Sequence, residues 1–198
     1  MKTENSLTTT IIGGKFKGRK ILLPSLDVTR SSKSILRGSL FDTLQFDIME
    51  NVFVEAFAGS GSIGIEALSR GARKVYFIEK DNNSYSILKK NILQIEPQKS
   101  ISIHGDTFVE LDGVIKELKR NGEQAYFYFD PPFNIRENQE DIYEKSLNLI
   151  ETIPTDVVIL IVIEHFTKVK MPENIGTYKL KKTKKFGKSS LSYYEYEI

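Results

Sequence analysis

Short apolar runs and apolar stripes with helical spacing alternate along most of this chain. The runs have the length of buried strands and fall at residues 52–54, 73–79, 100–104, 124–130 and 156–164. The stripes that follow them fall at residues 63–68, 82–93, 107–120 and 140–150. Strands that alternate with helical segments of this length predict a doubly wound α/β fold with a mostly parallel sheet and right-handed crossovers.

The two ends of the chain follow other patterns. Residues 11–23 combine apolar positions with glycine-assisted turns, which predicts a small N-terminal β-hairpin. A helix capped by Ser31 or Ser32 is expected next, with an apolar stripe formed by Ile35, Leu36, Leu40, Phe41 and Leu44. Residues 178–186 and 190–197 are predicted to form a C-terminal antiparallel hairpin. We therefore expect a seven-stranded, Rossmann-like sheet in residues 47–198 and a basic hairpin-and-helix extension in residues 1–46.

Composition narrows the possible chemistry. The 198 residues include no cysteine and only two histidines, which excludes disulfides, cysteine-ligated zinc and thiol catalysis, and leaves too few histidines for a histidine-based metal site. No apolar stretch approaches the ~20 residues that span a membrane, and the first residues lack the apolar core of a signal peptide. We expect a soluble, cytoplasmic monomer.

Basic residues are clustered although the net charge is only +2. Residues 15–20 hold four bases and residues 179–188 hold six, and neither segment contains an acid. Clusters at both ends of a near-neutral chain predict a phosphate-binding face, although two solvated loops would have the same composition.

A glycine motif follows the first strand of the predicted sheet. Residues 59–64 read Gly-Ser-Gly-Ser-Ile-Gly, and Glu79 lies about 20 residues beyond the first of these glycines. The turn brings the backbone close to a ligand, and the N-terminus of the helix that follows attracts an anionic group. An acid at the end of the second strand is suited to ribose hydroxyls. The motif therefore predicts an adenosine-containing ligand, which can be NAD or S-adenosylmethionine.

The sequence Asp130-Pro131-Pro132-Phe133 ends the most apolar strand. The prolines stiffen the exit from the strand and remove competing N–H donors. The Asp130 carboxylate and a neighbouring carbonyl can then accept both hydrogens of a planar –NH₂ group, while Phe133 offers a face for base stacking. This arrangement suits the exocyclic amine of adenine, guanine or cytosine, because acceptors on both hydrogens let the nitrogen lone pair localise in the transition state.

Together these motifs resemble the amino-methyltransferases that use S-adenosylmethionine, and more closely the RsmD family of bacterial small-subunit ribosomal RNA guanine-N2 methyltransferases. Residues 11–20, 57–71 and 130–133 carry the resemblance. One predicted helix departs from it. Arg30, Arg37 and Phe41 match the family's Arg-Pro-Thr…Arg-x-x-x-Phe pattern, but Ser31 replaces the proline and Gly38 stands where an acid is expected.

The resemblance implies methyl transfer from S-adenosylmethionine to the N2 amine of a guanine in ribosomal RNA, with S-adenosylhomocysteine as the product. It implies that the target base is held by Asp130, Pro131 and Phe133. The cofactor is expected at Glu55, Ala58, Gly59, Ser60, Gly61, Glu79, Lys80, Asp106 and Thr107. RNA contacts, within the small subunit or an assembly intermediate, are expected at Lys15, Lys17, Arg19, Lys20, Arg30, Arg37, Lys182 and Lys185. The direct transfer needs no metal ligand and no covalent nucleophile.

Other functions fit part of the pattern. Residues 130–133 are also compatible with a DNA adenine-N6 methyltransferase, and the glycine motif is also compatible with an NAD-linked oxidoreductase. A non-catalytic RNA-binding protein could retain the same fold. His104 and His165 are expected to be surface or satisfied core residues. Glu164 either lines the cleft or is an ordinary carboxylate at a strand end.

Overall fold

The computed structural model describes residues 7–24, 30–132 and 139–196, and within it one large sheet organises the chain. Its strand order is β5-β4-β3-β6-β7-β10-β9-β8. The strands are β3 (Val52–Glu55), β4 (Lys74–Glu79), β5 (Ser100–His104), β6 (Ala125–Phe129), β7 (Val158–Phe166), β8 (Asn174–Ile175), β9 (Tyr178–Phe186) and β10 (Ser189–Tyr196). From β5 to β7 all neighbours are parallel, and from β7 to β8 all are antiparallel.

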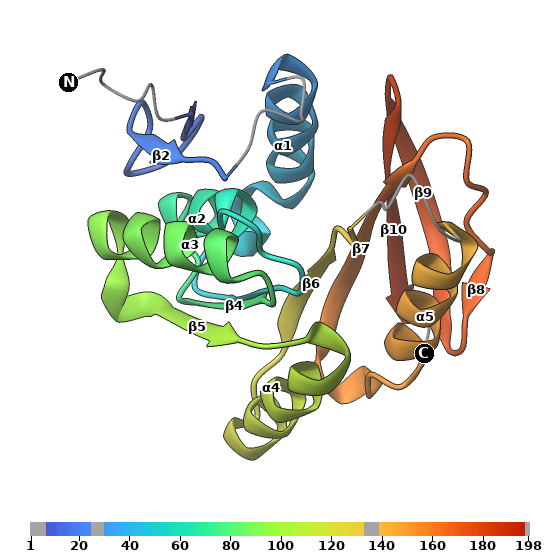
Figure 1. Ribbon diagram of the computed structural model, residues 1–198. Coiled ribbons are helices and arrows are strands. Elements are labelled where there is room, and N and C mark those ends of the chain that lie inside the picture. Colours follow the sequence, from blue (N-terminus) through green and yellow to red (C-terminus); the bar gives the residue numbers. More distant parts are fainter. Residues whose placement is uncertain (1–6, 25–29, 133–138, 197–198) are drawn as a thin grey trace.

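Helices cover both faces of this sheet (Figure 1). The helices are α1 (Arg30–Leu44), α2 (Ser62–Ser69), α3 (Asn82–Ile95), α4 (Thr107–Asn121) and α5 (Gln139–Glu151), with short 3₁₀ turns η1 (Gln45–Ile48), η2 (Pro97–Lys99) and η3 (Thr155–Val157). One apolar core joins α1, α2 and α3 to side chains such as Phe53 and Phe77. The other joins α4 and α5 to the alternate side chains of the same strands, such as Val54 and Tyr76. Because β3 and β6 are fully buried on both faces, they have continuous apolar runs rather than alternating ones.

The N-terminal hairpin pairs β1 (Thr8–Thr10) with β2 (Lys20–Leu22) as a separate two-stranded sheet. It packs on α2 and α3. The Ser69 hydroxyl donates to Gly13 O, and Phe16 N donates to Ser69 Oγ at 2.9 Å. The hairpin is therefore fixed to the same face of the large sheet as α1 (Figure 1).

Four details differ from the expectations. The first strand of the N-terminal hairpin is Thr8–Thr10, so the hairpin begins before the predicted residues 11–23. The large sheet has eight strands rather than seven, because the two-residue β8 is too short to leave a pattern in the sequence. Ser31 and Ser32 lie inside α1, which begins at Arg30, so neither caps it. Ile35 is 64% exposed, because the buried face of α1 is formed by Leu36, Leu40, Phe41 and Leu44. Within the described parts of the chain, no helix is long and apolar enough to cross a membrane.

Candidate active site

The glycine motif forms a tight turn between β3 and α2. Gly59 and Gly61 have φ angles of +53° and +79°, a region that favours glycine. Glu79, at the end of the neighbouring β4, accepts a hydrogen bond from Gly59 N at 2.6 Å and another from Asp81 N at 2.7 Å. A Cβ on Gly59 would meet nothing within 4 Å, so this part of the turn borders open space. Glu79 therefore holds in place the segment at which a ligand is expected.

Glu55 ends β3 and caps the beginning of α2. Its carboxylate accepts from Gly64 N at 2.9 Å and from Ile63 N at 3.3 Å. Burial raises the pKa of Glu55 to about 8, although these two N–H groups favour the charged form. A Cβ on Gly64 would lie 2.3 Å from the Phe77 ring and 2.9 Å from Glu55 Oε2, so only glycine fits there. The third glycine of the motif thus allows the strand-end carboxylate to reach the helix.

Asn91 of α3 links the glycine turn to the N-terminal hairpin. Its fully buried side chain donates to Ser60 O and to Leu22 O, both at 2.9 Å, and accepts from Leu22 N at 2.8 Å. Asn91 could not be identified from the sequence, because a single polar residue in a helical stripe carries no motif.

Lys80 and Asp106 lie at the ends of adjacent strands and form an ion pair of 2.7 Å. Asp106 also caps α4 by accepting from Phe108 N at 3.1 Å, and the Lys80 hydrogen bond lowers the pKa of Asp106. The Thr107 hydroxyl donates to Ala56 O, in the segment between β3 and the glycine turn. These interactions join the ends of β3, β4 and β5 at one edge of the sheet.

A pocket of about 210 Å³ lies where β3 and β6 end, beside Glu164 of β7 and the first turns of α1. Its lining includes the predicted residues Glu55, Ala58, Gly59, Ser60 and Asp130, together with Lys33, Arg37 and Glu164. Gly61, Glu79, Lys80, Asp106, Thr107 and Pro131 are not among the lining residues. The pocket is smaller than the roughly 300–1,000 Å³ typical of sites for drug-sized ligands. A dinucleotide-sized or nucleoside-sized cofactor would therefore extend beyond it.

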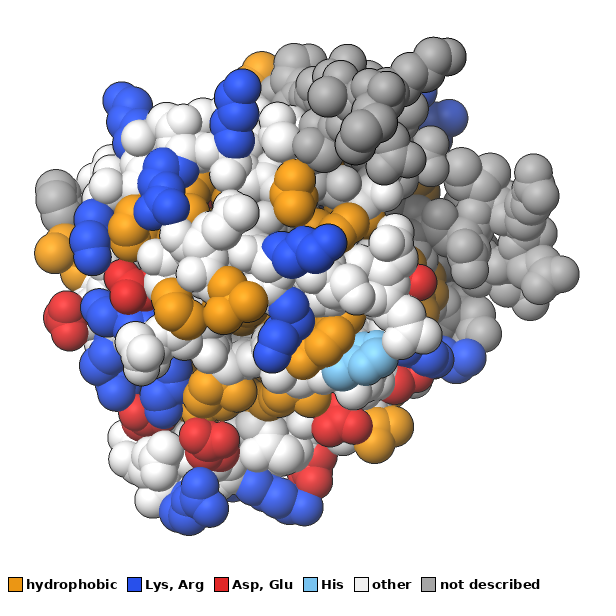
Figure 2. Space-filling model, turned by 60° about the vertical axis from the view of Figure 1, so that its left-hand side comes forward, with side chains coloured by type: hydrophobic (Ala, Val, Ile, Leu, Met, Phe, Trp, Pro, Cys, Tyr) orange, Lys and Arg blue, Asp and Glu red, His pale blue; other side chains and the backbone are white. Residues whose placement is uncertain are grey.

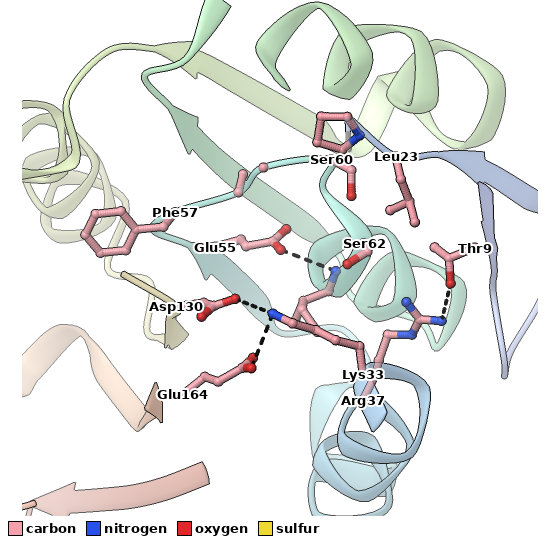
Figure 3. A pocket seen from close by; sticks show the side chains of 14 residues that line it. Thr9, Leu23, Lys33, Arg37, Glu55, Phe57, Ser60, Ser62, Asp130 and Glu164 are labelled. Carbon is pink, nitrogen blue, oxygen red and sulfur yellow. Dashed lines mark hydrogen bonds and ion pairs between the residues drawn. The ribbon is translucent and has the colours of Figure 1, made fainter. Parts of the chain in front are cut away.

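Asp130 meets Lys33 and Glu164 in this pocket (Figure 3). Lys33 Nζ lies 2.9 Å from Asp130 Oδ2 and 3.3 Å from Glu164 Oε1. Phe129 and Ile163 are paired in register between β6 and β7, so the residues after them, Asp130 and Glu164, are neighbours. Phe133 lies outside the described residues.

Burial and charge shift the pKa values of this cluster. Burial opposes the charge of Lys33, but the Asp130 and Glu164 carboxylates raise its pKa overall. Burial also raises the pKa of Glu164, with repulsion from Asp130 adding to the effect. The Tyr128 hydroxyl donates to Glu164 Oε2 at 2.6 Å, and its pKa is raised by burial and by Glu164.

Arg37 is buried and bonded within the protein, whereas the sequence predicted an RNA contact at this residue. Its side chain is only 4% exposed and lies 3.4 Å from Glu66 Oε2, and it donates to Thr10 O at 2.7 Å. The guanidinium therefore joins α1 to the hairpin. Among the other expected contacts, Lys15, Lys17, Arg19, Lys20, Lys182 and Lys185 are exposed. The Arg30 side chain lies outside the described residues.

The two histidines lie at the surface and in the core, as expected. His104 is exposed and stacks on Tyr85 at 4.4 Å between ring centroids. His165 is buried, with Nε2 2.8 Å from Ser192 Oγ. Neither lines the pocket.

The fold is that of a methyltransferase with a doubly wound α/β sheet. The model of the family described as "Conserved hypothetical protein 95" matches residues 9–195, so the chain belongs to this family. A Buchnera aphidicola (Acyrthosiphon pisum) protein named "Ribosomal RNA small subunit methyltransferase D" is 30% identical over 87% of this chain and 87% of its own length. A protein of the same name from Haemophilus influenzae is 31% identical over 71% of this chain and 69% of its own length.

A solved structure of the Escherichia coli protein yhhF, named as a methyltransferase, superimposes with a TM-score of 0.74. It is 26% identical in sequence, and the match covers 96% of this chain and 98% of that one. The family resemblance indicated by the motifs is thereby confirmed.

Proposed function

We propose that the chain transfers a methyl group from S-adenosylmethionine to the exocyclic N2 amine of a guanine in small-subunit ribosomal RNA. The observation that carries this proposal is the shared pocket of Asp130 and the Gly59–Ser60 turn. An amine held by Asp130 would face a ligand held by the turn, which in-line transfer requires. The relatives named as small-subunit methyltransferases support ribosomal RNA as the substrate class.

The residues around the turn suit the proposed cofactor. The pocket wall contains the buried Glu55 side chain, whose oxygens can accept a hydrogen bond from the cofactor's amino group, and the open side of Gly59 leaves room for a ligand. Glu79 and Asp106 stand at the adjoining strand ends, where the ribose and adenine would extend. The N–H groups of Gly59, Gly61, Ile63 and Gly64 are bonded within the protein. The cofactor carboxylate is therefore expected at Ser60 and Ser62, which also line the pocket.

Asp130 would act on the target amine. The cofactor, when bound, supplies a methyl group on a positively charged sulfur. Bond formation between the amine nitrogen and the methyl carbon would break the carbon–sulfur bond and would leave a positive charge on the nitrogen. The Asp130 carboxylate stabilises this charge and can accept the proton that nitrogen then loses. Pro131, which is buried directly after Asp130, restricts the backbone that positions the carboxylate.

The RNA would approach over α1 and its two basic neighbours. On one side lies the hairpin segment with Lys15, Lys17, Arg19 and Lys20. On the other lies β9, where Lys184 Nζ contacts the Thr43 hydroxyl of α1 at 2.8 Å. In the upper part of Figure 2, on the side of the molecule that carries the hairpin, Lys and Arg side chains are visible and Asp and Glu side chains are not. Phosphate contacts on both sides of α1 would bring a nucleotide to the pocket at its first turns.

The test uses purified protein, labelled S-adenosylmethionine and small ribosomal subunits from a strain that lacks the gene. We expect label in N2-methylguanosine after nuclease digestion. Asp130→Ala should abolish transfer, while calorimetry still detects cofactor binding. Asp112→Ala, a surface change on α4, should behave as wild type. Transfer to DNA but not to ribosomal RNA would refute the proposal, and so would full activity of Asp130→Ala.

A further inference from the structure

The pocket contains a second carboxylate with unmet hydrogen-bonding capacity. Glu164 is 1% exposed and lines the pocket. Its Oε2 is satisfied by the Tyr128 hydroxyl, but among the described residues its Oε1 has no hydrogen-bond partner and only the ion contact with Lys33 at 3.3 Å. A buried carboxylate oxygen without a hydrogen bond is costly to the protein, which suggests that a ligand completes it.

The position of Glu164 relates it to the target amine. Asp130 and Glu164 follow a paired position on β6 and β7, and both lie within reach of one ammonium nitrogen. Lys33 Nζ, hydrogen-bonded to Asp130 and in ion contact with Glu164 Oε1, occupies the place where a ligand could present a pair of N–H donors (Figure 3). The Lys33 side chain is 38% exposed, so it can withdraw toward solvent when such a donor pair enters.

Among the bases that carry an exocyclic amine, only guanine presents a second donor beside it. Its N2 amine adjoins the N1–H group, whereas the ring nitrogens that adjoin the amines of adenine and cytosine are acceptors. An acceptor facing Glu164 Oε1 would leave two lone pairs opposed in a buried site. The arrangement of residues 130–133 alone accepts an amine from any of the three bases, so the discrimination has to come from another group.

The geometry points to Glu164 as the residue that selects guanine, by accepting the N1–H while Asp130 accepts the N2 amine. This inference rests on the proposed function and adds to it a base-selecting residue on a different strand. Tyr128 holds Glu164 through Oε2, so that Oε1 is directed into the pocket. Lys33 balances the two negative charges while the pocket contains no base.

The variant Glu164→Gln tests this role because it changes the polarity of the side chain with almost no change in size. The Tyr128 hydroxyl continues to donate to the amide oxygen, which turns the amide –NH₂ toward the pocket. This group repels the N1–H of guanine and can donate to a ring nitrogen that lacks a hydrogen. The base analogue 2-aminopurine supplies that ring nitrogen, with its amine and ribose in the same positions as in guanine.

The experiment first maps the guanine that the wild-type protein methylates. Small-subunit RNA is then prepared by ligation with guanine or 2-aminopurine at that position, and is assembled into subunits. Initial rates of methyl transfer are measured for wild type, Glu164→Gln and Glu164→Asp. Glu117→Gln is the matched control, because Glu117 also accepts from a tyrosine hydroxyl, that of Tyr76 at 2.7 Å, but does not line the pocket.

We expect wild type and Glu117→Gln to prefer guanine over 2-aminopurine by about 100-fold, the discrimination given by one well-placed donor–acceptor contact. Glu164→Gln should lose about 100-fold in transfer to guanine and reduce the preference to less than about 10-fold. Glu164→Asp should be slower but should keep the preference, because it retains the carboxylate. Thermal unfolding and cofactor binding show that each variant is folded.

Equal losses on both bases in Glu164→Gln would overturn the inference and leave the proposed function intact, because Glu164 would then only support Asp130. If Glu164→Gln does not fold, loss of the preference in a folded Glu164→Asp would overturn it as well. Absence of transfer to guanine by wild type would instead refute the proposed function itself.

Discussion

Replacing Arg37 with methionine should loosen the N-terminal hairpin without altering phosphate contacts. Arg37 is buried in α1, and it donates to Thr10 O of β1 at 2.7 Å and lies 3.4 Å from Glu66 Oε2. Methionine is an unbranched apolar side chain that reaches about as far as the arginine Nε, and it has neither the charge nor the donors. The substitution therefore removes both interactions and fills most of the same volume.

The structure sets the expected magnitude. Removing one partner of a buried ion pair costs about 3–5 kcal/mol when the remaining charge is left alone. Glu66 is not left alone, because Arg70 Nε remains at 3.0 Å and Ile12 N donates to it at 2.9 Å. We therefore expect a loss of about 2–3 kcal/mol in the free energy of unfolding, below the full penalty. For a domain of this size that corresponds to a decrease in Tm of roughly 5–10 °C.

Urea denaturation and amide hydrogen exchange check this prediction. Exchange should accelerate in β1 and β2 before it does in the large sheet. For Arg37→Met, the slope of the logarithm of RNA affinity against the logarithm of salt concentration should equal that of wild type. Lys182→Met should instead reduce the size of this slope by about 1 and change the free energy of unfolding by less than ~0.5 kcal/mol. An unchanged stability of Arg37→Met together with a reduced salt slope would show that Arg37 contacts RNA and that the argument from burial is wrong.

Two further substitutions test the glycine turn. The pKa of Glu55, raised from its ordinary 4.5 to about 8, means that the folded protein binds one more proton than the unfolded chain between these values. The free energy of unfolding should therefore fall as pH rises from about 5 to 8, and denaturation measurements should show a weaker pH dependence for Glu55→Gln. An unchanged pH dependence in this variant would mean that other groups cause it. Asn91→Ala leaves three backbone groups without their buried partner, so we expect a loss of about 2–4 kcal/mol in urea denaturation and weaker cofactor binding in calorimetry. A loss below ~1 kcal/mol would indicate that water replaces the amide.

The sequence predicted the order and type of the main elements because their patterns are local. β5 and β9 have the bounds that were predicted, and the other long elements differ by a few residues. Apolar runs bounded by polar residues define such strands without knowledge of what packs on them. The two-residue β8 leaves no such pattern, because its pairing is determined by the neighbouring β9 rather than by its own residues.

The site residues that belong to motifs at strand ends could be predicted from the sequence, whereas those that α1 contributes could not. Asp130 and the glycine turn were expected to meet, because parallel strands bring their carboxyl ends to one edge of the sheet. Lys33 and Arg37 lie one turn apart in the same helix, and both are basic residues in a polar-looking segment. Only the packing of α1 shows that Lys33 reaches the pocket and that Arg37 is buried against Glu66.

The same packing explains how the family's helix pattern can change in this chain. Gly38 stands where an acid is expected, and a Cβ there would come no closer than 3.5 Å to Ile12, so the position has room for a side chain. The acid expected at that position would be close in sequence to Arg37, but here Arg37 is already paired with Glu66 of α2. The charge balance of α1 is therefore supplied by other elements: Glu66 for Arg37, and the carboxylates of Asp130 after β6 and Glu164 within β7 for Lys33. Because Lys33 depends on those carboxylates, any ligand that binds them must compete with it, and this links the first turns of α1 to occupation of the pocket.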